Sequence, residues 1–353
     1  MSLPQLVKRH RSLPLWGPPL VIAVGVFAWA QGPEPNPLSM IRQSNGETAL
    51  TVTVPAGQFV KFEISPDMAA WEPLHTAQST GTGTALYTDT GAPYRQRRFY
   101  RAVPVPGTNG VTGDHVQTSD GVVTIKPIYH GSFYLHWAGS GGTKIIYSDP
   151  SSQGAPAGRF MGLPKADLVV LTHRHGDHLN VTTLESLRNG TDTKIVAPQD
   201  VFDGMGTTTT GTTLKSLTTI FKTGQSSAAA NSPALPIQGL TIEGVPAYNA
   251  NHVKGNCNSY ILTIGGKRFY ISGDTGTTPE MNAMPNIDVA FLCINVPFTL
   301  TVADAAAATR AFRPKIIYPY HYRNQDGSFS DLGLFKTTVG QDLGIEVRNR
   351  NWY

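Results

Sequence analysis

Apolar residues in the first third of the sequence occur in short runs separated by Gly, Pro, Ser and Asp. Runs of this length, bounded by turn residues and lacking a helical pattern, are typical of β-strands. We predict a small β-sandwich module over residues 40–105, with Trp71 as a core anchor and strands at 48–54, 58–64, 84–88 and 98–103. Charge on an edge strand discourages pairing with other chains, so a solvated edge is expected at Arg95, Arg97, Arg98 and Arg101.

The pattern changes after residues 106–117, a stretch rich in Gly and Thr that we interpret as a linker. From 118 to 353 strands alternate with helices, which indicates an α/β domain. The expected strands are 122–128, 133–137, 144–148, 166–172, 194–197, 240–245, 259–264, 268–272, 289–295 and 315–320. The expected helical segments are 182–188, 199–205 and 302–312. Gly265-Gly266, between two of the strands, predicts a two-residue hairpin.

Residues 206–236 are rich in Thr, Ser, Gly and Ala, with one apolar patch at 217–221. A linker and a loop over the active site are both compatible with this composition.

The first thirty residues have the three parts of an export signal. Lys8, Arg9 and Arg11 form a basic start, residues 20–30 are apolar, and Ala28-Trp29-Ala30 is a small-x-small cleavage pattern. We therefore expect a signal peptide over 1–30, a linker over 31–39 and a periplasmic or secreted protein. A retained N-terminal anchor and a disordered leader are the alternatives, and an uncleaved leader would be the protein's contact with a membrane.

The net charge of the chain is +4, and the leader supplies three of these positive charges without any acidic residue. What remains is close to neutral, so the basic balance does not indicate a nucleic-acid partner. Cys257 and Cys293 could pair in an exported protein, but both lie in or beside predicted strands and could equally be buried thiols.

The candidate chemistry starts at Thr172-His173-Arg174-His175-Gly176-Asp177-His178, directly after the apolar run 166–171. A buried strand that ends in three imidazoles and a carboxylate is poorly suited to a core. Neutral imidazole nitrogens and carboxylate oxygens are the usual ligands of catalytic zinc.

More residues of the same types follow predicted strands elsewhere in the chain. They are His252, Asp274 in Gly-Asp-Thr, His321 in Tyr-Pro-Tyr-His and, earlier, His130. The remaining histidines His75, His115 and His136 are expected to be structural or surface residues. Tyr248 and Asn249 are weak candidates for the wall of a pocket.

The His-x-His-x-Asp-His motif, followed in order by His252, Asp274 and His321, resembles the metallo-β-lactamase superfamily over residues 118–323. Within it, the sequence resembles the metal-dependent hydrolases that include ascorbate-phosphate lactonases and N-acyl-phosphatidylethanolamine phospholipases. The resemblance implies a four-layer αββα sandwich over 118–353.

The resemblance also implies two divalent metal ions, zinc first, with manganese or iron as alternatives. His173, His175 and His252 would hold one ion, Asp177, His178 and His321 the other, and Asp274 would bridge them. Asp177 and His130 are assigned to catalysis, His130 by binding substrate or moving a proton. Asp149 is expected to accept a hydrogen bond from a metal-binding imidazole.

The function that the resemblance implies is hydrolysis by a metal-bound hydroxide. The substrate would be a small-molecule or lipid-like compound with a lactone, ester or phosphodiester bond, and the oligomeric state is left open. The alternatives are an iron-dependent oxidoreductase on the same fold, a β-lactam hydrolase and a non-catalytic binding protein.

Overall fold

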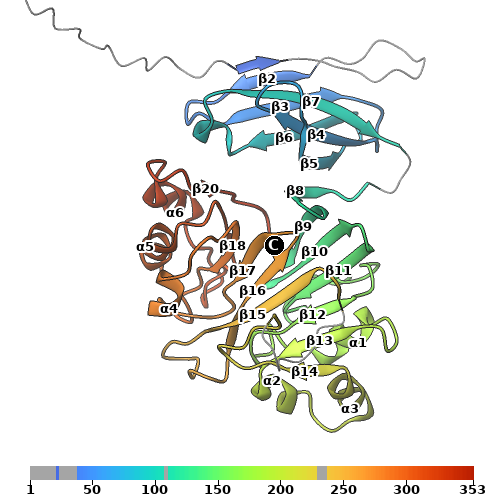
Figure 1. Ribbon diagram of the computed structural model, residues 1–353, viewed down its shortest axis with the longest axis vertical. Coiled ribbons are helices and arrows are strands. Elements are labelled where there is room, and N and C mark those ends of the chain that lie inside the picture. The colour runs from blue at the N-terminus through green and yellow to red at the C-terminus, as the bar shows by residue number, and fades with distance from the viewer. Residues whose placement is uncertain (1–20, 24–37, 107–109, 229–236) are drawn as a thin grey trace, which may run out of the picture.

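The computed structural model describes residues 21–23, 38–106, 110–228 and 237–353. A small all-β module lies above a larger part in which two sheets are stacked and helices cover both outer faces (Figure 1). Most of the predicted leader, 1–30, and of the linker 31–39 lies outside the described residues. Among those that are described, no helix has the length and apolar character needed to cross a membrane.

The N-terminal module is a sandwich of two sheets. One sheet contains β2 (Ser39–Arg42), β3 (Thr48–Thr53) and β6 (Thr84–Asp89); the other contains β1 (Val21–Ala23), β7 (Arg98–Val105), β4 (Phe59–Ser65) and β5 (Glu72–Gln78). Strands were predicted at β3, β4, β6 and β7, and these are confirmed, whereas β1, β2 and β5 were not predicted; β1 lies within the predicted leader and pairs with β7. Apolar side chains from both sheets fill the space between them, including Leu50, Phe62, Leu74 and Tyr100.

Two details of the module differ from the prediction. Trp71 is only partly buried and lies outside the module core, with the guanidinium of Arg101 4.5 Å from its ring. Arg98 is not a solvated edge residue, because its side chain is 11% exposed and forms an ion pair with buried Asp89. Arg95 and Arg97 are exposed, as expected.

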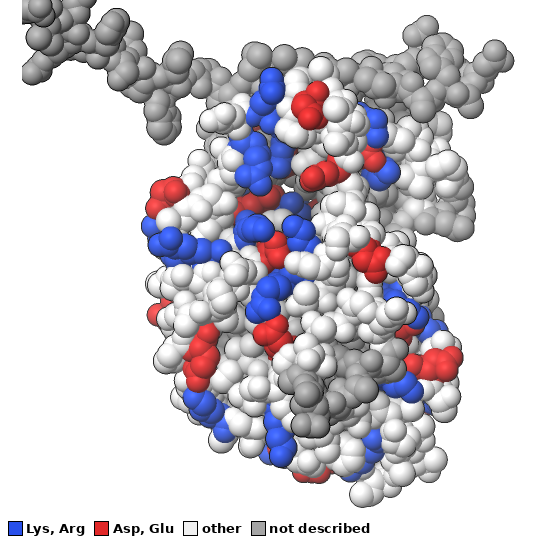
Figure 2. Space-filling model, viewed as in Figure 1, with Lys and Arg blue, Asp and Glu red and all other residues white. Residues whose placement is uncertain are grey.

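Strand β8 (Gly113–Thr118) lies in the stretch interpreted as a linker. It pairs with β5 of the module and with β9 (Gly121–Tyr129), so one continuous sheet passes from the module into the larger part. Figure 2 shows Lys and Arg gathered near this junction, interleaved with Asp and Glu. The junction is therefore a packed, charged interface and not a free hinge.

From β9 onward the first sheet continues through β10 (Ser132–Gly139), β11 (Gly142–Ser148), β12 (Leu168–Val170), β13 (Lys194–Ala197) and β14 (Thr218–Ile220). Its outer face is covered by α1 (Val181–Leu187), α2 (Gln199–Gly204) and α3 (Thr209–Ser216) (Figure 1). Side chains alternate along β12: Val169 packs with Leu184 and Leu187 of α1, whereas Leu168 and Val170 face the other sheet.

The second sheet has the order β15 (Leu240–Pro246), β16 (Asn258–Ile264), β17 (Lys267–Ile271), β18 (Val289–Cys293), β19 (Ile316–Tyr320) and β20 (Glu346–Val347). It is covered by α4 (Pro279–Asn282), α5 (Val302–Phe312) and α6 (Leu332–Val339). The two sheets share one core, in which the rings of Phe133 and Phe291 stack with centroids 4.2 Å apart. The αββα sandwich is confirmed.

The turn between β16 and β17 is Gly265-Gly266, and both residues have positive φ, 49° and 76°. This confirms the predicted hairpin, because such a turn needs left-handed backbone at both central positions. Of the polar stretch 206–236, residues 209–216 form α3 and residues 218–220 form the edge strand β14. This part of the stretch is therefore neither a linker nor an active-site loop. Cys257 and Cys293 are both buried free thiols.

Candidate metal centre

The candidate ligands come together where several strands end at one edge of the stacked sheets. His130 follows β9, Asp149 follows β11 and His321 follows β19, and each has a positive φ: 53°, 42° and 50°. Non-glycine residues rarely adopt this conformation, and it is concentrated at functional sites. These sharp turns let the ends of three different strands direct their side chains into one space.

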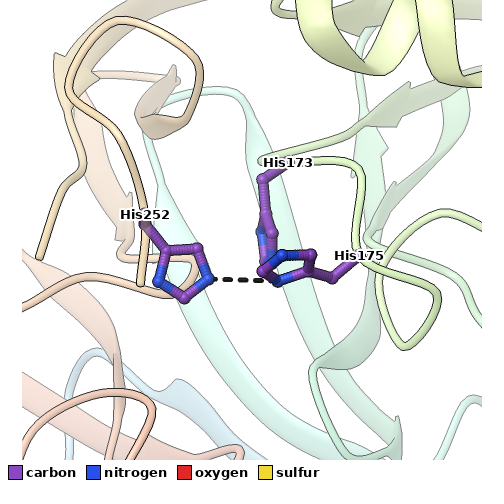
Figure 3. Close-up of side chains that lie close together, drawn as sticks. All are labelled: His173, His175 and His252. Carbon is purple, nitrogen blue, oxygen red and sulfur yellow. Dashed lines mark hydrogen bonds between the residues drawn. The ribbon is translucent and has the colours of Figure 1, made fainter. Parts of the chain in front are cut away.

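His173, His175 and His252 form the first group (Figure 3). His173 and His175 come from the loop after β12, and His252 from the loop after β15. His252 Nε2 lies 3.2 Å from His175 Nδ1, and the ring centroids of His173 and His252 are 4.8 Å apart. The ligand atoms of all three lie within 4.8 Å of one another.

The second group consists of Asp177, His178 and His321, with Asp274 between it and the first. His178 Nε2 and His321 Nε2 are 3.1 Å apart, and Asp177 Oδ2 is 3.3 Å from His321 Nε2 and 3.7 Å from His178 Nε2. Asp274 Oδ1 is 3.3 Å from His178 Nε2, while its Oδ2 is 3.8 Å from His252 Nε2. Each oxygen of Asp274 therefore faces a different group. All seven predicted ligands are brought together.

Hydrogen bonds behind the imidazoles determine which ring nitrogen is free. The Thr172 hydroxyl donates to Asp149 Oδ2 (2.7 Å), so it accepts from His173 Nδ1 (3.0 Å). His178 Nδ1 donates to the same carboxylate (2.9 Å), which confirms the predicted contact with Asp149. His252 Nδ1 donates to Asn249 Oδ1 (2.9 Å). His173 and His252 are thereby left with a bare Nε2 toward the site, and Nε2 of His178 also faces it.

These bare nitrogens are what a bound cation requires. The buried His173 Nε2 and Asp274 Oδ1 have no hydrogen-bond partner. His178 Nε2 and His321 Nε2 lie 3.1 Å apart, a spacing that needs either a proton or a cation between the two nitrogens. Two nitrogens bound to one tetrahedral zinc at 2.0–2.1 Å are about 3.3 Å apart, which matches this spacing.

The electrostatics of the site also favour cation binding. Burial lowers the pKa of His173 well below its ordinary value, and the neighbouring His178 adds to this effect. Burial acts against charge on His178 too, but Asp274, Asp177 and Asp149 outweigh it and raise the pKa of His178 well above the ordinary value. Burial opposes ionisation of Asp177 and Asp274, yet the surrounding imidazoles hold the pKa of both carboxyls far below the usual range. The carboxylates are thus ready to bind a cation.

His130 lies beside the second group, and ligand atoms of His130, Asp177 and His321 also lie within 4.8 Å of one another. Its Nε2 is 3.2 Å from Asp177 Oδ2, and its Nδ1 is 2.8 Å from the hydroxyl of Tyr353. That hydroxyl accepts from Arg323 N (3.1 Å), so its proton is directed to His130 Nδ1. The proton of His130 is then on Nε2 and donates to Asp177, which is the opposite tautomer to the other three imidazoles. Burial and His321 lower the pKa of His130 to about 4.

Two glycines allow the strand ends to approach so closely. A side chain on Gly131, next to His130, would lie 2.9 Å from His178 Cε1 and 3.2 Å from His321 Cδ2. Gly273, next to Asp274, has a φ of 56°, and a Cβ there would lie 2.7 Å from the Cβ of Thr172. A larger residue at either position would displace ligands of the candidate centre.

The two groups open into a cavity of about 550 Å³. Residues that the sequence did not single out form much of its wall: Tyr129, Gln153, Gly154, Asn251, Asn295, Phe298, Arg323, Asn324 and Gln325. Asn249 supports His252 from outside this wall, and the Tyr248 hydroxyl bonds to Glu280 instead. His75, His115 and His136 lie away from the cavity, as expected. Tyr353 reaches His130 from 223 positions away in the sequence, a contact that no local motif indicates.

Comparisons with known proteins identify the family of this chain. The profile of the family described as Beta-lactamase superfamily domain matches residues 146–322. A UPF0173 metal-dependent hydrolase of Pyrococcus abyssi is 28% identical over 236 residues, covering 64% of this chain and 96% of that protein. One from Thermococcus onnurineus is 30% identical over 235 residues, with the same coverage.

Two solved structures are also similar. A protein from Parabacteroides distasonis is 35% identical, with a TM-score of 0.56, and the match covers 68% of this chain and 99% of that one. Igni18, a metallo hydrolase from Ignicoccus hospitalis, is 26% identical, with a TM-score of 0.52, covering 65% and 94%. The chain belongs to the metallo-β-lactamase superfamily. The predicted class of enzyme, a metal-dependent hydrolase of that superfamily, is confirmed at this level.

Proposed function

We propose that this protein hydrolyses a lactone, a carboxylic ester or a phosphodiester at a centre of two divalent metal ions. The observation that carries the proposal is the pair of ligand groups that share Asp274 and face one cavity. His173, His175 and His252 would hold one ion, and Asp177, His178 and His321 the other. When bound, such ions lower the pKa of a coordinated water to near neutrality and polarise the oxygen of the scissile group.

The protein's own groups have separate tasks in this reaction. Asp149 accepts a hydrogen bond from His178 Nδ1 and, through the Thr172 hydroxyl, orients the ring of His173. Both imidazoles therefore direct Nε2 toward an ion. Asp177 accepts from His130 Nε2 while it faces the second group. His130 lines the cavity with its Nε2–H, which can donate a hydrogen bond to an oxygen of the substrate.

The direct test is metal analysis of the purified protein followed by a screen of lactones, phosphodiesters and β-lactams. We expect two zinc ions per chain and turnover of one of the first two classes. Iron with a visible spectrum would favour redox chemistry. Full metal loading with no turnover in any class would favour a binding protein.

His130→Ala refines the assignment of that residue. We expect turnover to fall by about 10²- to 10³-fold, the usual cost of removing one hydrogen-bond donor to a developing oxyanion, while the metal content stays unchanged. Loss of metal in this variant would make His130 a ligand and would contradict its role as a hydrogen-bond donor to the substrate.

We also infer that the protein is exported, on the strength of the basic, apolar and small-x-small parts of residues 1–30. N-terminal sequencing of the protein recovered from the periplasm or medium should begin at Gln31. Recovery from the membrane with the leader intact would indicate an anchor.

A further inference from the structure

Arg323 is the single Lys or Arg among the described residues that line the cavity of the candidate metal centre. It follows His321 by two positions, so the turn that presents a candidate metal ligand also presents this guanidinium. The two carboxylates in the same wall, Asp177 and Asp274, face the two ligand groups. No ion pair joins Arg323 to an acidic residue in the described part of the chain.

Neighbouring groups fix the position of Arg323 on both sides. Its backbone N–H donates to the Tyr353 hydroxyl (3.1 Å), and its carbonyl accepts from Asn295 Nδ2 (2.6 Å). One guanidinium N–H donates to the Tyr129 hydroxyl (3.0 Å), which in turn donates to the carbonyl of Gly154 (2.5 Å). A guanidinium has five N–H donors, and a single one is engaged here, so a fork remains for a ligand.

The rest of the wall suits a small polar ligand. Gln153, Asn251, Asn324 and Gln325 are uncharged amides, and Phe298 is the one large aliphatic or phenyl side chain in the lining. A cavity of about 550 Å³ is of the size that holds small molecules. An anion in this cavity would meet a positioned guanidinium that has no ion-pair partner among the described residues.

We propose that Arg323 binds an oxyanion group of the substrate, a carboxylate or a phosphate, while the scissile bond lies at the metal centre. This inference rests on the proposed function and narrows its substrate class to water-soluble, anionic esters. The guanidinium fork fits both oxyanions, so the experiment has to distinguish them.

The test uses three γ-lactone probes: one that carries a carboxylate, its neutral primary amide, and one that carries a phosphate monoester. The readout is kcat/KM for each anionic probe divided by kcat/KM for the neutral probe. We expect Arg323→Gln to lower this ratio by about 10- to 100-fold, mainly through KM. A fall of this size corresponds to the typical strength of a hydrogen bond to a charged group. Arg323→Lys should recover part of it, because it keeps the charge but not the fork.

Arg313→Gln is the matched control, because Arg313 is also exposed and does not line the cavity. It should leave the ratio unchanged, and all variants should keep the metal content of the wild type. The anionic probe whose kcat/KM ratio falls more in Arg323→Gln, the carboxylate or the phosphate, identifies the oxyanion that Arg323 binds. An equal ratio in wild type and Arg323→Gln, for both anions, would overturn the proposal.

Failure of the proposed function can be recognised separately. If the wild type hydrolyses none of the probes, calorimetric binding of the carboxylate probe to the zinc-loaded protein still tests Arg323. Weaker binding to Arg323→Gln than to the wild type supports the subsite, and equal binding refutes it.

Discussion

The molecule contains two buried clusters of charged and titratable side chains, and their hydrogen bonding differs. At the junction with the N-terminal module, Asp114 accepts from Arg350 Nε, the Tyr318 hydroxyl and His75 Nδ1, each at 2.8 Å. Nearby, Glu346 accepts from Arg348 Nε at 2.7 Å. Every carboxylate of this junction cluster has a cation supplied by the chain.

In the described part of the candidate metal centre, no Lys or Arg pairs with a carboxylate. Asp177 and Asp274 face imidazoles instead; the buried His173 Nε2 has no hydrogen-bond partner, and the nearest groups to Asp274 Oδ1 are imidazole nitrogens of His178 (3.3 Å) and His321 (3.5 Å). Buried charge that is fully paired contributes to the architecture, whereas buried ligand atoms that face one another unpaired require a bound cation. Composition alone would not separate the two clusters; their hydrogen bonding does.

The largest effect is expected from Asp274→Ala, which removes the carboxylate shared by the two ligand groups. Replacing even an outer partner of a metal ligand costs 10- to 100-fold in metal affinity or activity. Loss of the shared ligand should therefore exceed about 100-fold in activity and reduce the metal content of purified protein. Metal analysis and kcat/KM on the same sample check this. Two retained metals with a normal rate would contradict the ligand assignment.

Asp114→Ala should instead destabilise the fold. It leaves Arg350 without its carboxylate partner, whereas Arg348 keeps Glu346, and breaking a buried pair in this way costs about 3–5 kcal/mol. Urea unfolding of the metal-free protein should show this decrease in the free energy of unfolding. The folded fraction of Asp114→Ala should keep its capacity to bind metal. A loss of metal binding without loss of stability would erase the distinction between the two clusters.

The junction should also respond to pH through His115, which bonds to Thr76 Oγ1 (2.7 Å) and Thr124 Oγ1 (2.9 Å). Burial and the neighbouring His75 lower the pKa of His115 to about 3 in the folded protein, below its ordinary value of 6.5. The unfolded chain therefore takes up a proton first. The stability associated with neutral His115 is present above pH 6.5 and is lost as the pH falls from there toward the folded pKa.

One such group changes the free energy of unfolding by about 1.4 kcal/mol per pH unit, or about 2 kcal/mol between pH 6.5 and pH 5. His115→Gln should flatten the pH dependence of unfolding by this amount in metal-free protein. Parallel curves for wild type and variant would show that His115 does not titrate on unfolding.

The sequence predicted the parts of the fold and site that are local in the chain. Alternating apolar runs identified most strands, because a buried strand face needs that pattern, and four candidate ligands lie within six positions of one another at 173–178. His252, Asp274 and His321 could be added because each follows a predicted strand and their order matches the superfamily that the motif resembles. Asp149 followed from the need of a ligating imidazole for a carboxylate behind it.

The rest depends on contacts between distant segments. Strand β8 was taken for a linker because its Gly- and Thr-rich surroundings resemble a loop until β5 and β9 are placed beside it. Helix α3 contains four Thr residues and a Gly, which are weak helix formers, and it is held by burial of Leu214. Trp71 was assigned to the core by its size, but size does not say which face of a module a side chain occupies.

Tyr353 is where the two clusters meet, and it gives the smallest expected effect. Arg348 and Arg350 of the junction cluster hold the segment that carries the Tyr353 hydroxyl to His130 Nδ1. Tyr353→Phe keeps the ring contacts with Tyr129 and Phe329 but removes the proton that fixes the tautomer of His130. We expect kcat to fall by roughly 3- to 10-fold, which corresponds to the loss of one hydrogen bond of about 0.5–1.5 kcal/mol, with stability and metal content unchanged. Histidine ¹⁵N spectra of the metal-free protein should show His130 with its proton on Nε2 in the wild type and a mixture of tautomers in the variant. If the tautomer of His130 and kcat are unchanged in Tyr353→Phe, the junction cluster only stabilises the fold, and the two regions act independently.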